Sequence, residues 1–78
     1  MPIVLRIDAY AFGFFASDRT EPAHVHVRCR GKKAKFWLNP VSVASKGRFR
    51  PHELNRVEAL IWENEARLLE AWHEYFDR

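Results

Sequence analysis

The clearest pattern in the chain is an alternation of apolar and polar residues over residues 24–38, which read HVHVRCRGKKAKFWL. Two strand-like segments flank Gly31, and a glycine at that position favours a tight hairpin turn. If Gly31 and Lys32 form the loop, Val27 pairs with Phe36, and all the apolar residues share one face. We therefore predict a hairpin whose inner face carries Val25, Val27, Cys29, Ala34, Phe36 and Leu38.

The opposite face of this hairpin carries imidazoles, cations and an indole. The same register places His26 beside Trp37, with the cations of both strands at neighbouring positions on that face. We predict that this face remains open to solvent and forms the binding surface of the protein. Its predicted members are His24, His26, Arg28, Arg30, Lys33, Lys35 and Trp37.

The segments before and after this hairpin also read as strands. Residues 3–7 (IVLRI) and 10–15 (YAFGFF) are apolar and flank Asp8-Ala9, which predicts a first hairpin. Residues 16–23 are polar and form the predicted loop between the hairpins. Residues 41–50 are expected to hold a short edge strand and then a basic connector. The predicted pairs of the first hairpin are Ile7 with Tyr10, Leu5 with Phe12, and Ile3 with Phe14.

From Pro51 to about Phe76 the apolar spacing changes to three, four and seven residues, which predicts an amphipathic helix. Asn64 interrupts the apolar stripe. A helix of this length is too long to be buried entirely on a small sheet. We therefore expect its last turns, with Trp72, Tyr75 and Phe76, to project or to meet a partner, including a second copy of the chain.

Together these elements predict an α+β fold. Its antiparallel sheet has four to five strands, built from two hairpins, and one long C-terminal helix packs on one face of the sheet. A chain of 78 residues suits a single domain over residues 1–78.

The positive and negative charges are unevenly distributed along the chain, and this bears on the kind of partner it could bind. The net charge is +3, but residues 1–50 hold ten Lys and Arg against three acids, a balance of +7. Residues 51–78 hold three Arg against seven acids, a balance of −4. A basic sheet half and an acidic helical half indicate a nucleic-acid surface, two partner surfaces, or neutralisation within the fold.

Cysteine use and hydropathy bear on the compartment. Cys29 is the only cysteine, so no internal disulfide can form, which suits a reducing compartment. No apolar run is long enough to span a bilayer, and the first residues, MPIVLRID, lack the shape of a signal peptide. We expect a cytoplasmic protein with no membrane partner and no cofactor.

His24 and His26 are the candidate chemical groups, and three interpretations stay open. Their side chains start about 6.6 Å apart on one strand face, a spacing that an acid–base pair acting on a phosphodiester could use. They could instead share a metal ion with a third ligand, for which Asp18, Glu21 and His52 are candidates. The third interpretation is a polar strand face without chemistry, since short histidine motifs are common.

Trp37 adds an aromatic group to the same face. A tryptophan flanked by cations on an open sheet is typical of surfaces that stack single-stranded bases. A protein partner is an equally good occupant. The third alternative is a tryptophan covered by residues 16–23 or 41–50.

The chain resembles a small bacterial family catalogued as domain of unknown function 4160. The matching segments are MPIVLRID, EPAHVHV, KFWLNPV and HELNRVEALIWENEARLLEAWHEYF, which cover nearly all of the sequence. The chain departs from the family at Ala9, Ala23, Asn39 and Arg48, in turns and loops. The resemblance implies a partner that is another small protein, in a toxin–antitoxin-like pair, and it implies no established catalytic residues.

Two function classes follow. The first is a small intracellular bacterial interaction protein, the toxin-like component of such a pair, which binds a cognate protein and, as a second candidate, RNA. The second is a small enzyme, a metal-independent ribonuclease that uses His24 and His26. The first needs only surfaces that the sequence supplies, so it is the preferred hypothesis.

Overall fold

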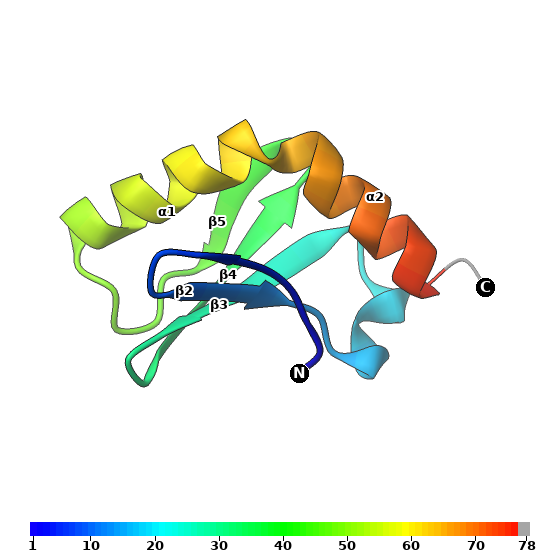
Figure 1. Cartoon of the computed structure of the whole chain (residues 1–78), viewed down its shortest axis with the longest axis horizontal. Helices are drawn as coiled ribbons and strands as arrows, with labels where there is room; N and C mark the ends of the chain where they lie inside the picture. The colour runs from blue at the N-terminus through cyan, green and yellow to red at the C-terminus, as the bar shows by residue number, and fades with distance from the viewer. Residues whose placement is uncertain (77–78) are drawn as a thin grey trace.

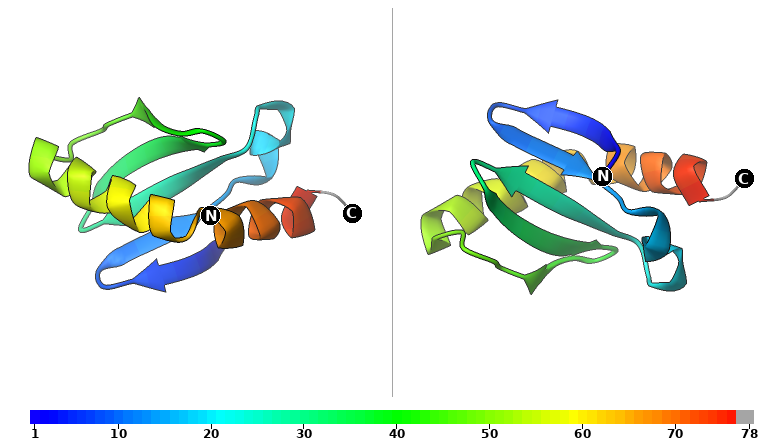
Figure 2. Two further views of the ribbon diagram at one scale, coloured as in Figure 1. Left: turned by 90° about the horizontal axis from the view of Figure 1, so that it is seen from above. Right: turned by 90° about the horizontal axis from the view of Figure 1, so that it is seen from below.

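The computed structural model describes residues 1–76, which form a five-stranded antiparallel sheet and two consecutive helices (Figure 1). The strands lie in the sheet in chain order, each antiparallel to its neighbours. Both helices cross the same face, so the view from below shows the sheet in front of them (Figure 2). The elements are β1 (Ile3–Ile7), β2 (Tyr10–Gly13), the 3₁₀ helix η1 (Ala16–Thr20), β3 (His24–Cys29), β4 (Lys32–Leu38), β5 (Val41–Ser45), α1 (Pro51–Glu63) and α2 (Glu65–Phe76).

The core lies between the sheet and the helices. The six residues predicted for the inner face of the second hairpin are all buried, so their sorting is confirmed. Val57, Ile61 and Leu68 of the helices are buried against them. The α+β class and the fifth strand are therefore also confirmed. The prediction that the other face of the hairpin is open to solvent is wrong at His24, which is also buried.

The predicted register of the second hairpin is wrong by two residues. The loop consists of Arg30 and Gly31, with φ angles of 51° and 80°, as a type I′ turn requires. Val27 therefore lies opposite Ala34 rather than Phe36. A shift of two residues keeps every side chain on its predicted face, because side chains alternate with a period of two.

A contact with α1 favours the observed register. Lys32, assigned to the loop by the sequence, is a strand residue on the inner face, opposite Cys29. Its Nζ donates hydrogen bonds of 2.9 Å to both carboxylate oxygens of Glu53 in α1. In the observed register this ion pair joins β4 to α1.

The first hairpin follows the prediction except at its open end. Ile7 pairs with Tyr10 and Leu5 with Phe12, as predicted. Ile3, however, lies opposite Gly13, because an irregularity between Ile3 and Leu5 shifts the register. Such a bulge adds one residue to one strand, and the alternation of side chains does not reveal it.

The single long helix is wrong, because the helical segment breaks at Asn64. The Asn64 side chain donates a 2.8 Å hydrogen bond to the carbonyl of Leu60, and its backbone leaves helical geometry at φ −116° and ψ 16°. Asparagine side chains compete in this way for backbone groups. The helix axis bends at this residue, so α2 descends past the end of the sheet (Figure 1).

The expectation that the C-terminal turns project is also wrong. Trp72 is buried, and its ring lies edge-on to Phe14, with 5.2 Å between the ring centroids. Tyr75 and Phe76 contact the same phenylalanine. The bend at Asn64 is the physical reason, since it directs these aromatic residues onto the end of the sheet.

Among residues 1–76, neither helix has the length and apolar composition that crossing a membrane requires.

Candidate functional site

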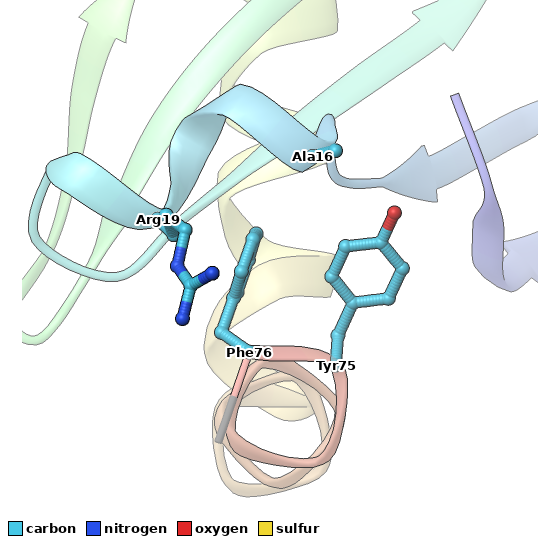
Figure 3. Close-up of a pocket in the computed structure, with 4 residues that line it drawn as sticks. All are labelled: Ala16, Arg19, Tyr75 and Phe76. Atoms are coloured by element: carbon cyan, nitrogen blue, oxygen red, sulfur yellow. The ribbon is translucent and has the colours of Figure 1, made fainter. Parts of the chain in front are cut away.

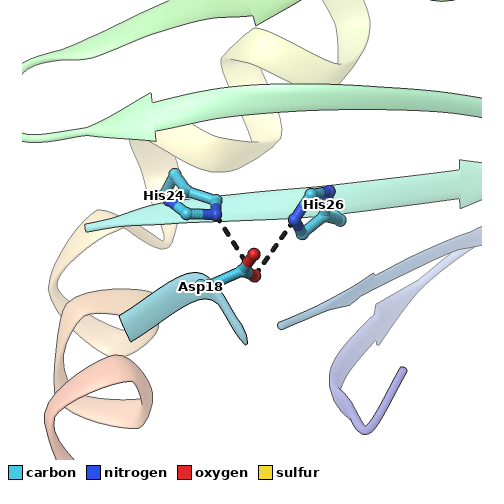
Figure 4. A group of neighbouring side chains, drawn as sticks. All are labelled: Asp18, His24 and His26. Atoms are coloured by element: carbon cyan, nitrogen blue, oxygen red, sulfur yellow. Dashed lines mark hydrogen bonds and ion pairs between the residues drawn. The ribbon is translucent and has the colours of Figure 1, made fainter. Parts of the chain in front are cut away.

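Three side chains that could act as acids, bases or metal ligands converge at one end of the sheet (Figure 4). The Nε2 atoms of His24 and His26 lie 3.2 and 3.0 Å from the same carboxylate oxygen, Oδ2 of Asp18. All three donor atoms lie within 4.8 Å of one another. We call these three residues the histidine cluster.

Two elements build the histidine cluster. His24 and His26 lie two residues apart in β3, so their side chains share one face of the sheet. Asp18 comes from η1, where its Oδ2 accepts a 2.7 Å hydrogen bond from the backbone N–H of Phe15. The backbone N–H of Asp18 in turn donates to the Phe15 carbonyl over 2.9 Å. This reciprocal pair holds the carboxylate over the two imidazoles.

The environment alters the charge of two members of the cluster. Burial by itself raises the pKa of the Asp18 carboxyl, but the Phe15 N–H and the two imidazoles hold that pKa below its usual value. Burial lowers the pKa of the His26 imidazole, and the Asp18 carboxylate opposes this shift only in part. At neutral pH the cluster therefore contains a carboxylate and a neutral His26.

Aromatic rings surround the imidazoles. His24 is fully buried, with the Trp72 ring of α2 at 5.0 Å and the Trp37 ring of β4 at 5.6 Å between centroids. The Phe15 ring lies 4.7 Å from that of His26, edge to face. Solvent reaches the cluster mainly at His26, whose side chain is 22% exposed, compared with 0% for His24.

The other members of the predicted binding surface divide into two groups. Lys35 and Trp37 are half-buried, and the Lys35 Nζ lies 4.7 Å from the centre of the Trp37 ring. Lys35 is also paired with Glu21 in the segment after η1. Arg28, Arg30 and Lys33 are exposed around the hairpin turn.

The exposed cations continue as a row across the sheet. Arg6 of β1 lies beside Ala11, Ala11 beside Arg28, and Arg28 beside Lys33. We call Arg6, Arg28 and Lys33 the basic row. Within the described residues none of these three forms an ion pair.

The candidates for a third metal ligand lie at different places. Asp18 joins the two histidines, whereas Glu21 lies 3.7 Å from Nδ1 of His24, on the other side of the ring. His52 lies in the first turn of α1 beside Glu53, whose partner Lys32 adjoins the hairpin turn. Of the three candidates, only Asp18 approaches both Nε2 atoms.

The sequence interpretation missed two residues that enclose the cluster. It assigned Phe15 to a strand and Trp72 to a projecting helix end, but they contact His26 and His24, respectively. A local signal existed for Phe15, because Asp18 stands three residues later, at the spacing of a helix-capping carboxylate. No local signal existed for Trp72, whose position depends on the bend between the helices.

A separate pocket of about 350 Å³ lies between η1 and the end of α2 (Figure 3). Ala16, Arg19, Tyr75 and Phe76 line it. It contains none of the residues that the sequence predicted for the site, and it offers one guanidinium and one phenol.

These features define the class: a small α+β protein with helices on one face of an antiparallel sheet and a histidine cluster and basic row on the other. The chain belongs to the family described as Domain of unknown function (DUF4160), whose model matches residues 10–73. The searches of curated proteins and of solved structures find no match.

Proposed function

We propose that this protein is a small cytoplasmic bacterial interaction protein whose basic row binds an acidic segment of a cognate protein. The observation that carries the proposal is the direct pairing of Arg28 with Lys33 across β3 and β4. Like charges opposite each other destabilise a strand pair. An anionic partner would remove this repulsion on binding.

The arrangement of cations suits an extended acidic segment. Neighbouring strands lie about 4.8 Å apart, so a row across four strands spans about 14 Å. The connector after β5 approaches the same end of the sheet, because Gly47 packs against the Lys33 carbonyl. Lys46 and Arg48, on either side of this glycine, are exposed and add to the positive charge.

The position of the Lys35 ammonium over the Trp37 ring favours a protein partner over single-stranded RNA. A base that stacks on this ring would have to displace the Lys35 ammonium and break its pair with Glu21. The family resemblance also leads us to expect a small cognate protein, in a toxin–antitoxin-like pair. RNA is the second candidate, because the basic row suits phosphates as well as carboxylates.

The ribonuclease hypothesis has weaker support. A general acid or base must reach the substrate, but the His24 side chain is fully buried. Both Nε2 atoms also point at one carboxylate oxygen rather than at opposite sides of a cleft.

The test uses the full chain as bait in an extract of its native host. The variant Arg28→Glu/Lys33→Glu reverses the central charges of the basic row, and Arg56→Glu/Arg67→Glu makes the same charge change on the helices. We expect a small acidic protein to bind the wild type and the helix variant, with affinity for the row variant reduced about 100-fold.

Three outcomes are informative. Nuclease-resistant binding that weakens with salt and is lost in the row variant supports the proposal. A partner that binds the row variant as tightly as the wild type overturns it. Capture of RNA alone, removed by nuclease, replaces the protein partner with the second candidate.

A further inference from the structure

The histidine cluster is independent of the basic row, and its geometry differs from that of an ordinary buried polar contact. Three donor atoms from β3 and η1 point into one space. We infer that Asp18, His24 and His26 form a binding site for one divalent transition-metal ion of the zinc class.

The first support is the orientation of the His24 ring. Its Nδ1 lies 2.8 Å from the carbonyl oxygen of Pro22, which can only accept a hydrogen bond, so Nδ1 carries the proton. In the neutral ring the lone pair of Nε2 then points into the cluster. A carbonyl acceptor on the other ring nitrogen is the usual arrangement for a metal-binding histidine.

The second support is that this Nε2 atom is buried and makes no hydrogen bond. It lies 3.2 Å from Oδ2 of Asp18, close to an oxygen that also carries negative charge. In the neutral ring the Nε2 lone pair and the carboxylate repel each other at this distance, and either a metal ion or a proton between them removes the repulsion. A bound metal ion turns both atoms into ligands and removes the cost of the buried unpaired nitrogen.

The third support is the spacing of the donors. Zinc binds nitrogen and oxygen ligands at about 2.0–2.1 Å, so two ligands of a tetrahedral site lie about 3.3 Å apart. The carboxylate oxygen lies 3.2 and 3.0 Å from the two imidazole nitrogens. The two imidazole nitrogens lie within 4.8 Å of each other, so the side chains must draw together around an ion. Binding also replaces the 3.0 Å hydrogen bond between His26 Nε2 and Asp18.

The surroundings indicate the class of metal and the open position. Two imidazoles and one carboxylate suit zinc and its neighbours, whereas magnesium and calcium prefer oxygen ligands alone. The Phe15 N–H orients the Asp18 carboxylate, and the Phe15 and Trp72 rings limit solvent. Three protein ligands leave a further position for water or a partner group, on the side where His26 reaches solvent.

The experiment titrates Zn²⁺ into the chelator-treated full chain by calorimetry and records the visible spectrum with Co²⁺. The variants are Asp18→Asn, which keeps the shape of the side chain, and His26→Gln, which removes the more exposed imidazole. His52→Gln is the matched control, because it removes an exposed histidine outside the cluster.

We expect about one equivalent of Zn²⁺ per chain, and d–d absorption from Co²⁺ held by nitrogen and oxygen ligands. Each cluster variant should weaken binding more than about 100-fold, which exceeds the usual effect of losing an outer-shell partner. The His52 variant should bind as the wild type does. Zn²⁺ at about 100 times its Kd should raise the Tm of the wild type by about 10–20 °C.

The inference is overturned if the folded wild type binds no Zn²⁺, which would assign the cluster to a structural contact between β3 and η1. It is equally overturned if binding survives both cluster variants, since the metal would then lie elsewhere. Circular dichroism shows whether each variant is folded. If one variant unfolds, the other variant and the Tm shift of the wild type still decide.

Discussion

The two ends of the hairpin formed by β3 and β4 have the same alternating pattern but opposite surroundings. At one end, η1 covers the outer face and Trp72 of α2 contacts His24 past the end of the sheet, so His24 has no exposed surface. At the other end, Arg28 and Lys33 are exposed and have no ionic partner among the described residues. Alternation assigns a side chain to a face, but a distant segment decides whether that face is covered.

The largest expected effect is at the covered end, in the neighbours Phe14 and Phe15. Phe14 is fully buried against Trp72, so Phe14→Ala should lower the free energy of unfolding by about 3–5 kcal/mol. Phe15 is 38% exposed, and Phe15→Ala should cost about 1 kcal/mol. Urea denaturation measures both, and equal costs would mean that α2 does not pack on Phe14.

The comparison is most direct between two residues on the same face of the hairpin. His24→Ala leaves a cavity and an unpaired Pro22 carbonyl, and should lower the free energy of unfolding by about 2–4 kcal/mol. Lys33→Ala at the open end should stay within about 0.5 kcal/mol of the wild type. A His24→Ala protein as stable as the wild type would contradict the burial of His24 at this end of the hairpin.

Two glycines at the open end show how rigidly the connector is held. Gly47 has a φ of 56°, and an added Cβ would lie 1.7 Å from the Lys33 carbonyl oxygen. Gly47→Ala should therefore cost about 2–3 kcal/mol, because the backbone has to move. Gly31 also has positive φ but open space around it, so Gly31→Ala should cost about 1 kcal/mol. Thermal unfolding of the two variants tests this order. The reverse order would mean that the connector does not pack against β4.

The smallest effect is a pH dependence at the open end. The hydrogen bond from the Arg50 backbone, followed by the one from Lys32, lowers the pKa of the Glu53 carboxyl in the folded chain. A lowered folded pKa stabilises the protein above the unfolded pKa, and this contribution is lost as the pH falls through the folded value. In urea denaturation between pH 6 and about pH 3, we expect the free energy of unfolding of Glu53→Gln to fall less with decreasing pH than that of the wild type. An unchanged pH dependence would contradict the role of this pair.

Much of the fold was predictable from the sequence, because local periodicity carries it. Alternation in residues 24–38 placed Val27 and Phe36 on the inner face, and both are fully buried. The change to helical spacing after Pro51 located the helical segment, although it predicted one continuous helix and not the break at Asn64. Each of these features depends on residues a few positions apart.

Only the tertiary structure decided three features: the register of the second hairpin, the burial of His24, and the meeting of Asp18 with the two histidines. Shifting the hairpin by two residues leaves every face unchanged, so alternation does not distinguish the registers; in the observed register Lys32 lies in β4 and pairs with Glu53, 21 positions away. The bend at Asn64 brings Trp72 to His24, and η1 brings Asp18 to both imidazoles. Such contacts depend on how separate elements pack against one another, which a periodic pattern does not record, so a sequence pattern names candidates for them without showing which meet.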